Sequence, residues 1–188
     1  MFLLHLIGDV HQPLHATGFK KGGNLVEPVC WGKTPAPDEA CEIGELNLHS
    51  VWDSSILHKY RGLPKSVDND REKVAAKQWA AELFAKQSRA GTVPEDECTD
   101  ISGVDCVLEW AIESNGLVCR RVLAPGEDWI REHDLSKKYY EDNKRFVEEQ
   151  VGKAGLRLAG WLNAIAEAIF LEEGPAFEQE QAVLVGDL

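Results

Sequence analysis

The 188-residue sequence lacks any uninterrupted apolar segment long enough to cross a bilayer. Its most apolar stretch, residues 156–171, is interrupted by Arg157, Asn163 and Glu167. Residues 1–7 are apolar, but they have neither the basic region nor the small-residue cleavage site of a signal peptide. These absences predict a soluble chain with no signal peptide and no membrane partner.

Basic residues are also scarce, with 20 Lys and Arg against 32 Asp and Glu, which gives a net charge of -12. This balance argues against a protein held on nucleic acid by a broad basic patch, because phosphate contacts of that kind need many cationic side chains. It does not exclude a nuclease that binds phosphate through metal ions, since those ions supply the local positive charge.

The five cysteines form no Cys-x-x-Cys pair. Cys30 and Cys41 lie in a loop rich in Gly and Pro, and Cys98 and Cys106 flank another, so we predict the local disulfides Cys30–Cys41 and Cys98–Cys106. Cys119 is then unpaired, which suggests a partner elsewhere and a chain truncated at its N-terminus. The alternative is a cytosolic protein with five free thiols.

The sequence shows no convincing set of β-strands, whereas apolar residues recur at helical spacing in several segments. We predict helices over residues 1–9, 45–61, 70–90, 106–117 and 136–171, the last broken or bent near Gly152 and Gly155. Residues 16–46 are predicted to be loop, with room for one short β-hairpin around residues 24–31. The predicted class is all-α, with one helical domain over residues 1–171 and a flexible acidic tail over residues 172–188.

Two His-x-x-x-Asp pairs are the most informative feature of the chain. His5 and Asp9 are four residues apart, as are His49 and Asp53, so on a helix each pair lies on one face. His15 follows a helix-ending proline and can turn back toward the same region. Imidazole and carboxylate groups together are typical zinc ligands, so the sequence predicts a metal site.

Three longer motifs contain these residues and carry a family resemblance. They are His5-x-x-Gly-Asp9-x-His-Gln-Pro-Leu-His15, Gly22-Gly-Asn24 and Asn47-Leu-His49-x-x-Trp-Asp53. Together with segments 110–119 and 154–163, they resemble the zinc-dependent single-strand-specific nucleases of the S1/P1 nuclease family over residues 1 to about 165. The resemblance implies the helical fold that this family shares with bacterial zinc phospholipases C.

The resemblance also implies a secreted endonuclease that hydrolyses single-stranded DNA and RNA to 5′-nucleotides and acts on 3′-nucleotides, by in-line attack of a zinc-bound hydroxide. By position, His5 and Asp9 would act through a pair of zinc ions bridged by Asp9. His15, His49 and Asp53 would hold a third zinc. Asn24 and the backbone at Gly22 match the family's base-binding pocket, and no obligate protein partner is evident.

The sequence departs from the family pattern at its start, because the N-terminal tryptophan and several further zinc ligands have no counterpart here. The same holds for the cysteine expected to pair with Cys119. We therefore expect one complete zinc ligand set, uncovered apolar surface, and a chain that is inactive or nearly so. Two alternatives remain: a phospholipase C-like phosphodiesterase, and a degenerate, non-catalytic helical protein stabilised by zinc.

Overall fold

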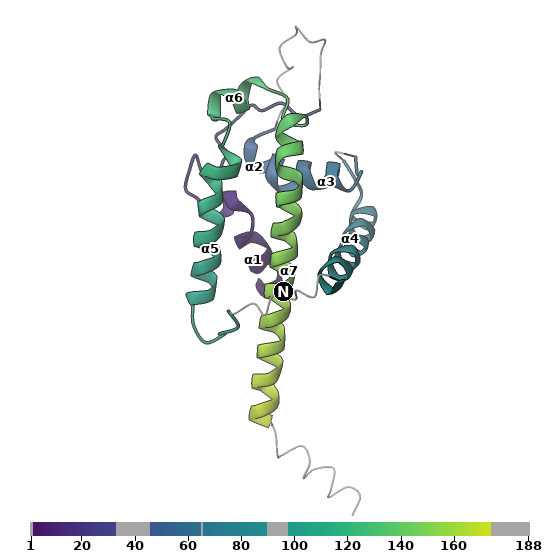
Figure 1. The fold of residues 1–188 in the computed structure, drawn as a ribbon, viewed down its shortest axis with the longest axis vertical. Helices are drawn as coiled ribbons and strands as arrows, with labels where there is room; N and C mark the ends of the chain where they lie inside the picture. Colours follow the sequence, from purple (N-terminus) through teal and green to yellow (C-terminus); the bar gives the residue numbers. More distant parts are fainter. Residues whose placement is uncertain (1, 33–45, 65, 90–97, 174–188) are drawn as a thin grey trace, which may run out of the picture.

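The computed structural model describes residues 2–32, 46–64, 66–89 and 98–173, and within these ranges the fold is all-α, as predicted. Figure 1 shows the long helix α7 as the vertical axis, with α1 and α5 along one side and α4 on the other. The elements in chain order are α1 (Phe2–Val10), the 3-10 turn η1 (Pro13–Ala16), α2 (Leu48–Ser50), the π-helical turn η2 (Val51–Ser55), α3 (Ile56–Tyr60), α4 (Asn69–Arg89), α5 (Asp105–Leu117), the π-helical turn η3 (Val118–Val122), α6 (Glu127–Glu132) and α7 (Lys138–Glu173).

The structure differs from the sequence prediction in several local features. The helix predicted over residues 45–61 is divided by the π-helical turn η2, and the predicted interruption near Gly152 and Gly155 is absent, since α7 is one continuous helix. The short helix α6 was not predicted. Helix α7 also includes Glu172 and Glu173, which we had assigned to the tail; residues 174–188 lie outside the described residues.

No hairpin forms over residues 24–31. Val29 makes an isolated antiparallel bridge to Leu46, and Cys30 makes a parallel bridge to Asp134. The segment therefore pairs with two distant parts of the chain and not with itself, which explains why local alternation of residues was misleading.

Two groups of buried side chains stabilise the arrangement. The larger joins the loop after η1, the α2–α3 region and the first half of α7, and it includes Leu14, Leu48, Trp52 and Tyr139. The smaller group joins α1, α5 and α7 and consists of Ile7, Cys106, Trp110 and Trp161. Both groups contact the segments that carry the predicted metal ligands, so core packing fixes the backbone beneath those ligands.

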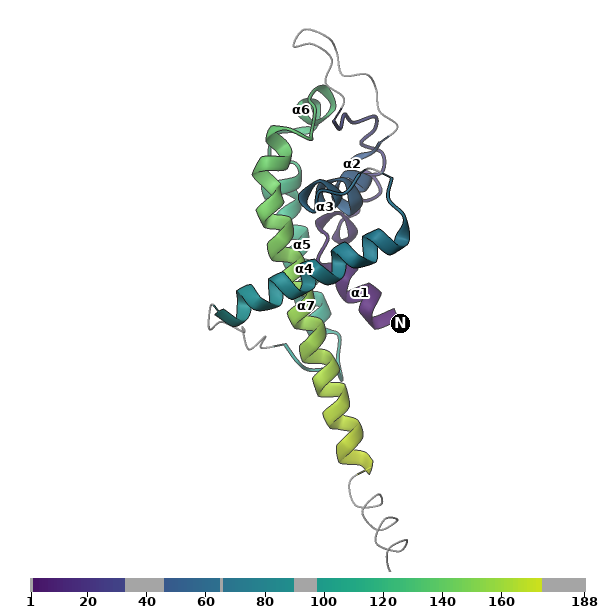
Figure 2. The same cartoon turned by 90° about the vertical axis from the view of Figure 1, so that its right-hand side faces the viewer.

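Helix α4 crosses α7 in the view of Figure 2 and is attached at few points. The ring of Trp79 packs against Tyr60 with 5.5 Å between centroids, and Glu82 accepts two hydrogen bonds from Arg61. Lys86 forms an ion pair with Glu148 of α7. Most of the other α4 side chains are exposed, so this helix contributes little to the core.

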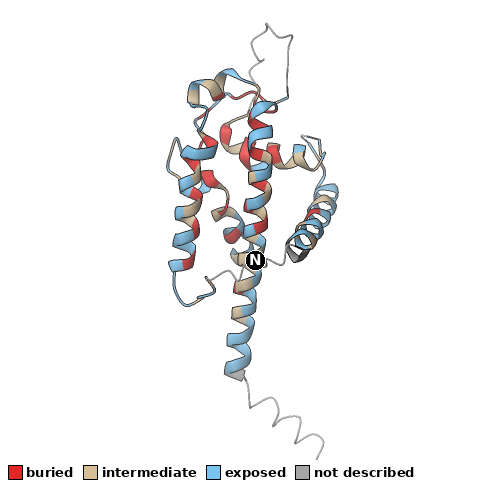
Figure 3. Ribbon diagram, viewed as in Figure 1, coloured by how far each residue is buried: buried red, intermediate tan, exposed pale blue. Residues whose placement is uncertain are grey.

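Several large apolar side chains lie on the surface, and Figure 3 shows that the lower half of α7 is largely exposed. Examples on α1 and α5 are Leu6, 58% exposed, and Ile112, 63% exposed. Over residues 138–171, α7 is long and apolar enough to cross a membrane, contrary to our reading of the sequence, and a window of it has mean hydropathy 1.3. That test tolerates two charged residues, and core helices of soluble proteins also pass it.

The buried hydroxyl of Tyr139 links the two halves of the main core. It accepts a hydrogen bond from the indole N–H of Trp52 and donates one to the carbonyl oxygen of Val122, each 2.8 Å long. The Tyr139→Phe variant leaves that indole N–H buried without a partner, so we expect it to lower the free energy of unfolding by about 1–3 kcal/mol, measured by urea denaturation. The Tyr140→Phe control should cost less, because the Tyr140 hydroxyl makes no hydrogen bond to the described residues. Equal losses would contradict this account.

Candidate metal centre

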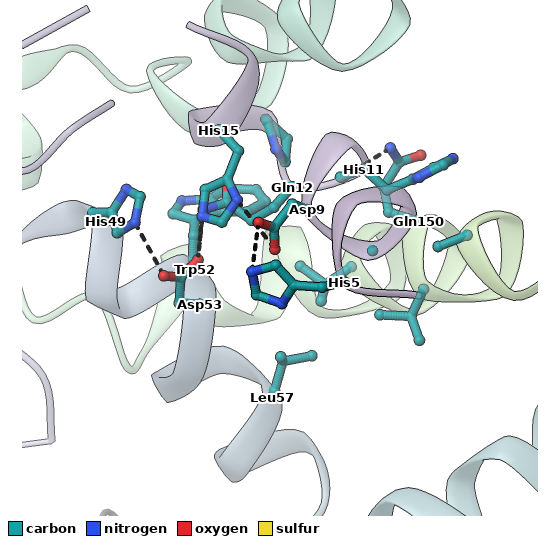
Figure 4. Close-up of a pocket in the computed structure, with 15 residues that line it drawn as sticks. His5, Asp9, His11, Gln12, His15, His49, Trp52, Asp53, Leu57 and Gln150 are labelled. Atoms are coloured by element: carbon teal, nitrogen blue, oxygen red, sulfur yellow. Dashed lines mark hydrogen bonds and ion pairs between the residues drawn. The ribbon is translucent and has the colours of Figure 1, made fainter. Parts of the chain in front are cut away.

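Three segments bring His15, His49 and Asp53 together. His15 lies in η1, His49 in α2 and Asp53 in the π-helical turn η2. The Nε2 atoms of His15 and His49 lie 3.1 and 3.0 Å from the two carboxylate oxygens of Asp53. The two imidazole rings are stacked, with 4.9 Å between their centroids. Figure 4 shows the two histidines on either side of the Asp53 carboxylate.

The ring of His49 is oriented by the loop at Gly22. Its Nδ1 lies 2.7 Å from the Gly22 carbonyl oxygen. A carbonyl oxygen only accepts hydrogen bonds, so Nδ1 carries the hydrogen and, in a neutral ring, Nε2 presents a lone pair. Metal-binding histidines are commonly held by such a bond from their second nitrogen.

These atoms repel one another unless a cation lies between them. The lone pair of a neutral His49 faces a carboxylate oxygen at 3.0 Å. Both nitrogens of His15 also face carboxylates, Nδ1 at 3.5 Å from Asp9 and Nε2 at 3.1 Å from Asp53, whereas a neutral imidazole has one N–H. A proton or a metal ion resolves both conflicts.

The donor set fits zinc. One ligand atom from each of His15, His49 and Asp53 can be chosen so that all lie within 4.8 Å of one another. Zinc bonds of roughly 2.0–2.2 Å in a tetrahedral site place neighbouring ligand atoms about 3.3–3.6 Å apart, close to the spacings found here. Two imidazoles and a carboxylate are a common zinc ligand set, and they leave a fourth position for water or substrate.

The second predicted pair lies beside this group but is less enclosed. Asp9, near the end of α1, has one oxygen 3.5 Å from His15 and the other 3.2 Å from Nε2 of His5. Asp9 thus lies between the two histidines. The His5 side chain is 73% exposed, so it is not the buried ligand that the resemblance implied.

A cavity of about 480 Å³ opens over these groups (Figure 4). One wall carries His5, Asp9, His15, His49 and Asp53, and the other is formed by Trp52, Leu57 and the α7 residues Val147, Gln150, Val151 and Ala154. The cavity therefore combines a polar, ligand-bearing wall with an apolar one, as small-molecule sites commonly do.

Two amides tie the ligand-bearing segments together. Gln12 accepts a hydrogen bond from the Leu14 amide at 2.5 Å and donates one to Asp53 at 2.7 Å, so it joins η1 to η2. Asn47 caps the helix that bears His49 and donates to Asn24 at 3.3 Å. The Asn24 amide in turn donates to the Lys21 carbonyl, so both ends of the side chain proposed to bind a base contact the protein.

Behind the ligands, His11 is the centre of a buried polar network. Its Nδ1 contacts the Ile7 carbonyl at 2.7 Å, and Arg157 of α7 donates to its Nε2 at 2.8 Å. The Gln150 amide donates to the His11 carbonyl at 3.2 Å. Burial lowers the pKa of the His11 imidazole, which keeps the ring neutral and able to accept from Arg157.

Glu113 of α5 completes this network. It accepts a hydrogen bond from Arg157 at 2.8 Å and forms an ion pair with Lys153. Burial alone would raise the pKa of the Glu113 carboxyl, but the hydrogen bonds from Lys153 and Arg157 outweigh it and hold that pKa below its ordinary value. The network joins α1, α5 and α7 immediately behind the turn that carries Asp9 and His15.

Sequence reasoning missed most of these supporting residues. Gln12 lies inside the recognised motif, so its position was a usable signal. Gln150 lies on the apolar stripe of α7 and is 5% exposed, and a polar residue at such a position signals a buried hydrogen bond. The roles of Glu113 and Arg157 depend on packing between distant helices, which spacing along the chain does not reveal.

The cysteines are arranged as follows. Cys98 and Cys106 are joined by a disulfide with 5.3 Å between their Cα atoms. Cys30 is also disulfide-bonded, and its predicted partner, Cys41, lies outside the described residues. Cys119 carries an exposed free thiol.

The helical fold and the His and Asp ligands define a candidate metalloprotein, and comparison with known proteins places it more closely. The family model for S1/P1 nuclease matches residues 1–167, so the chain belongs to the S1/P1 nuclease family, as its motifs suggested. It is 32% identical to nuclease S1 of Aspergillus oryzae over 171 residues, which cover 88% of this chain and 53% of that protein.

Other relatives are similarly distant. Nuclease P1 of Penicillium citrinum is 31% identical over 170 residues, covering 87% of this chain and 56% of its own length. Endonuclease 4 of Arabidopsis thaliana is 32% identical over 176 residues, covering 88% and 49%. The chain therefore spans about half the length of the curated relatives that it matches.

Gly22 can be tested as the residue that orients His49. Its φ is +64°, and a Cβ placed there would lie 2.7 Å from the Leu14 backbone oxygen, so Gly22→Ala must displace the loop. We expect zinc affinity, measured by competition with a chromophoric chelator, to fall about 10–100-fold. Gly18→Ala is the matched control, since a Cβ at Gly18 meets open space. Unchanged affinity in Gly22→Ala would exclude the orienting role.

The Glu113 network predicts a pH dependence of stability. Glu113→Gln should lower the free energy of unfolding by about 1–3 kcal/mol at neutral pH. Because the folded-state pKa of Glu113 is lowered, its contribution is present above the ordinary carboxyl pKa and is lost as the pH falls through the folded value. Thermal unfolding of both proteins between neutral pH and about pH 3 should therefore show the difference shrinking on acidification. Glu109→Gln, an exposed change on the same helix, should show no such trend.

Proposed function

We propose that the protein is a zinc-dependent nuclease that acts on single-stranded DNA and RNA and on 3′-nucleotides. The observation that carries this proposal is the convergence of His15, His49 and Asp53 on one point, with Asp9 and His5 beside them. Membership of the S1/P1 nuclease family and the names of the relatives, nucleases S1 and P1 and endonuclease 4, support it.

In this proposal His15, His49 and Asp53 hold one zinc ion, and Asp9 and His5 contribute to a neighbouring zinc group. Bound zinc would supply Lewis acidity toward a phosphate oxygen and would lower the pKa of a nearby water. The chain's own residues orient these ligands: the Gly22 carbonyl fixes His49, and Gln12 holds Asp53. The apolar wall formed by Trp52, Leu57 and Val151 limits the access of bulk water.

We also propose that residues 1–171 form one helical domain and that the protein is secreted. The Cys98–Cys106 disulfide supports an oxidising compartment. In the described residues the neighbouring zinc group receives two protein ligands, His5 and Asp9, so we expect residues 1–188 alone to cut slowly or not at all.

Zinc content and cleavage test this proposal separately. Native mass spectrometry of residues 1–188 should show one tightly bound zinc, and His49→Ala should weaken it by more than the roughly 10–100-fold typical of losing an outer-shell partner. His58→Ala, a histidine that pairs with Glu72 outside the centre, should bind zinc like the parent protein.

Any cleavage of a labelled oligonucleotide should require zinc, favour single strands over duplex, and be lost in His49→Ala while surviving in His58→Ala. The proposal fails if His49→Ala retains full zinc binding. It also fails if the zinc-loaded protein hydrolyses a phospholipid and leaves single strands uncut.

A further inference from the structure

A second cavity, of about 600 Å³, lies between η3, α6 and the first turn of α7. Its chemically distinctive lining residues are Arg120, Arg121, Trp129, Lys138, Asp142 and Asn143. It shares no lining residue with the cavity over the metal centre.

The charge of this cavity is opposite to that of the chain. Three cationic side chains and one carboxylate line it, whereas the whole chain has a net charge of -12. Such a local reversal of sign attracts anions to one place on an otherwise repelling surface.

The two arginines keep most of their hydrogen-bonding capacity. Nε of Arg120 donates to the Gly116 carbonyl at 2.8 Å, and the Arg121 guanidinium lies 5.4 Å from the centroid of the Phe146 ring. Within the described ranges, neither guanidinium is paired with a carboxylate. Each arginine has five N–H donors in a planar fork, so donors remain for an incoming anion.

The remaining two charges nearly cancel. Lys138 and Asp142 form an ion pair at 2.6 Å, with side chains 75% and 55% exposed. An exposed pair of this kind is weak, so it leaves Lys138 free to exchange partners. The net positive charge of the cavity therefore comes from Arg120 and Arg121.

The cavity is built on a rigid base. Tyr139 and Asn143 are 2% and 3% exposed, and the Asn143 amide donates to the Tyr139 carbonyl at 2.9 Å. Trp129 is held by stacking on His133, with 4.2 Å between ring centroids.

The backbone that presents the arginines has an unusual geometry. Both lie on the π-helical turn η3, and the other π-helical turn in the described residues, η2, carries Asp53. Turns of this type occur frequently at functional sites.

From these observations we propose that the cavity binds a phosphate group of a single-stranded nucleic acid at a position separate from the metal centre. The proposal rests on the proposed function, because it takes the ligand to be the strand on which the nuclease acts. The guanidinium forks of Arg120 and Arg121 match the geometry of a phosphate, and the Trp129 ring offers an aromatic surface beside it.

Binding without cleavage tests the proposal. A fluorescently labelled thymidine dodecamer is titrated with residues 1–188 in excess chelator, and anisotropy is followed between roughly 50 and 200 mM NaCl. The Arg120→Gln, Arg121→Gln double variant should bind about tenfold more weakly. The slope of log K against log salt should become shallower by about 1.4, from two lost phosphate contacts at about 0.7 each.

Two further variants make the test specific. Asp142→Asn removes the one carboxylate that lines the cavity and should bind the dodecamer several-fold more tightly. The Arg71→Gln, Lys77→Gln double variant removes the same charge from exposed positions of α4 and should bind like the parent protein. Thermal unfolding of all four proteins verifies that each variant is folded.

The outcomes separate this proposal from the proposed function. Parent-like affinity in the Arg120→Gln, Arg121→Gln variant overturns the phosphate site, as does the absence of binding by the parent in chelator while its zinc-loaded form cuts single strands. Arginine-dependent binding by a protein that cuts nothing supports the phosphate site and counts against the nuclease proposal alone.

Discussion

The carboxylate of Asp53 is the point on which the described site depends. Three nitrogen atoms, from His15, His49 and Gln12, lie 2.7–3.1 Å from its two oxygens. Each nitrogen comes from a segment that begins or ends beside the main core, and the π-helical turn η2 presents the carboxylate toward them. Because Gly22 fixes the tautomer of His49, the group places lone pairs opposite one another, an arrangement that a cation stabilises.

The polar network around His11 gives this site a firm support. His11 follows Asp9 by two residues, and Arg157 and Gln150 hold it from α7, while Glu113 holds Arg157 from α5. Loss of any one member leaves buried polar groups without partners, which is costly in a low-dielectric interior. The site is thus positioned by hydrogen bonds on one side and by apolar packing on the other.

Much of this was predictable from sequence, for physical reasons that differ between residues. The metal ligands were found because His49 and Asp53 are four residues apart, a spacing that a helical turn converts directly into proximity. The hairpin was wrong because the partners of Val29 and Cys30 are distant in sequence. The interruption expected at Gly152 and Gly155 was wrong because packing and hydrogen bonds on both sides keep α7 helical through weak helix formers.

The central claim is that His15, His49 and Asp53 are the ligands of a tightly bound zinc ion. X-ray absorption spectroscopy at the zinc edge of the protein carrying one zinc per chain tests it most directly. The account predicts two imidazole nitrogens at about 2.0–2.1 Å and oxygen ligands at about 2.0–2.2 Å. A sulfur ligand at about 2.3 Å, which the exposed thiol of Cys119 would supply, or a shell without imidazole scattering would contradict it.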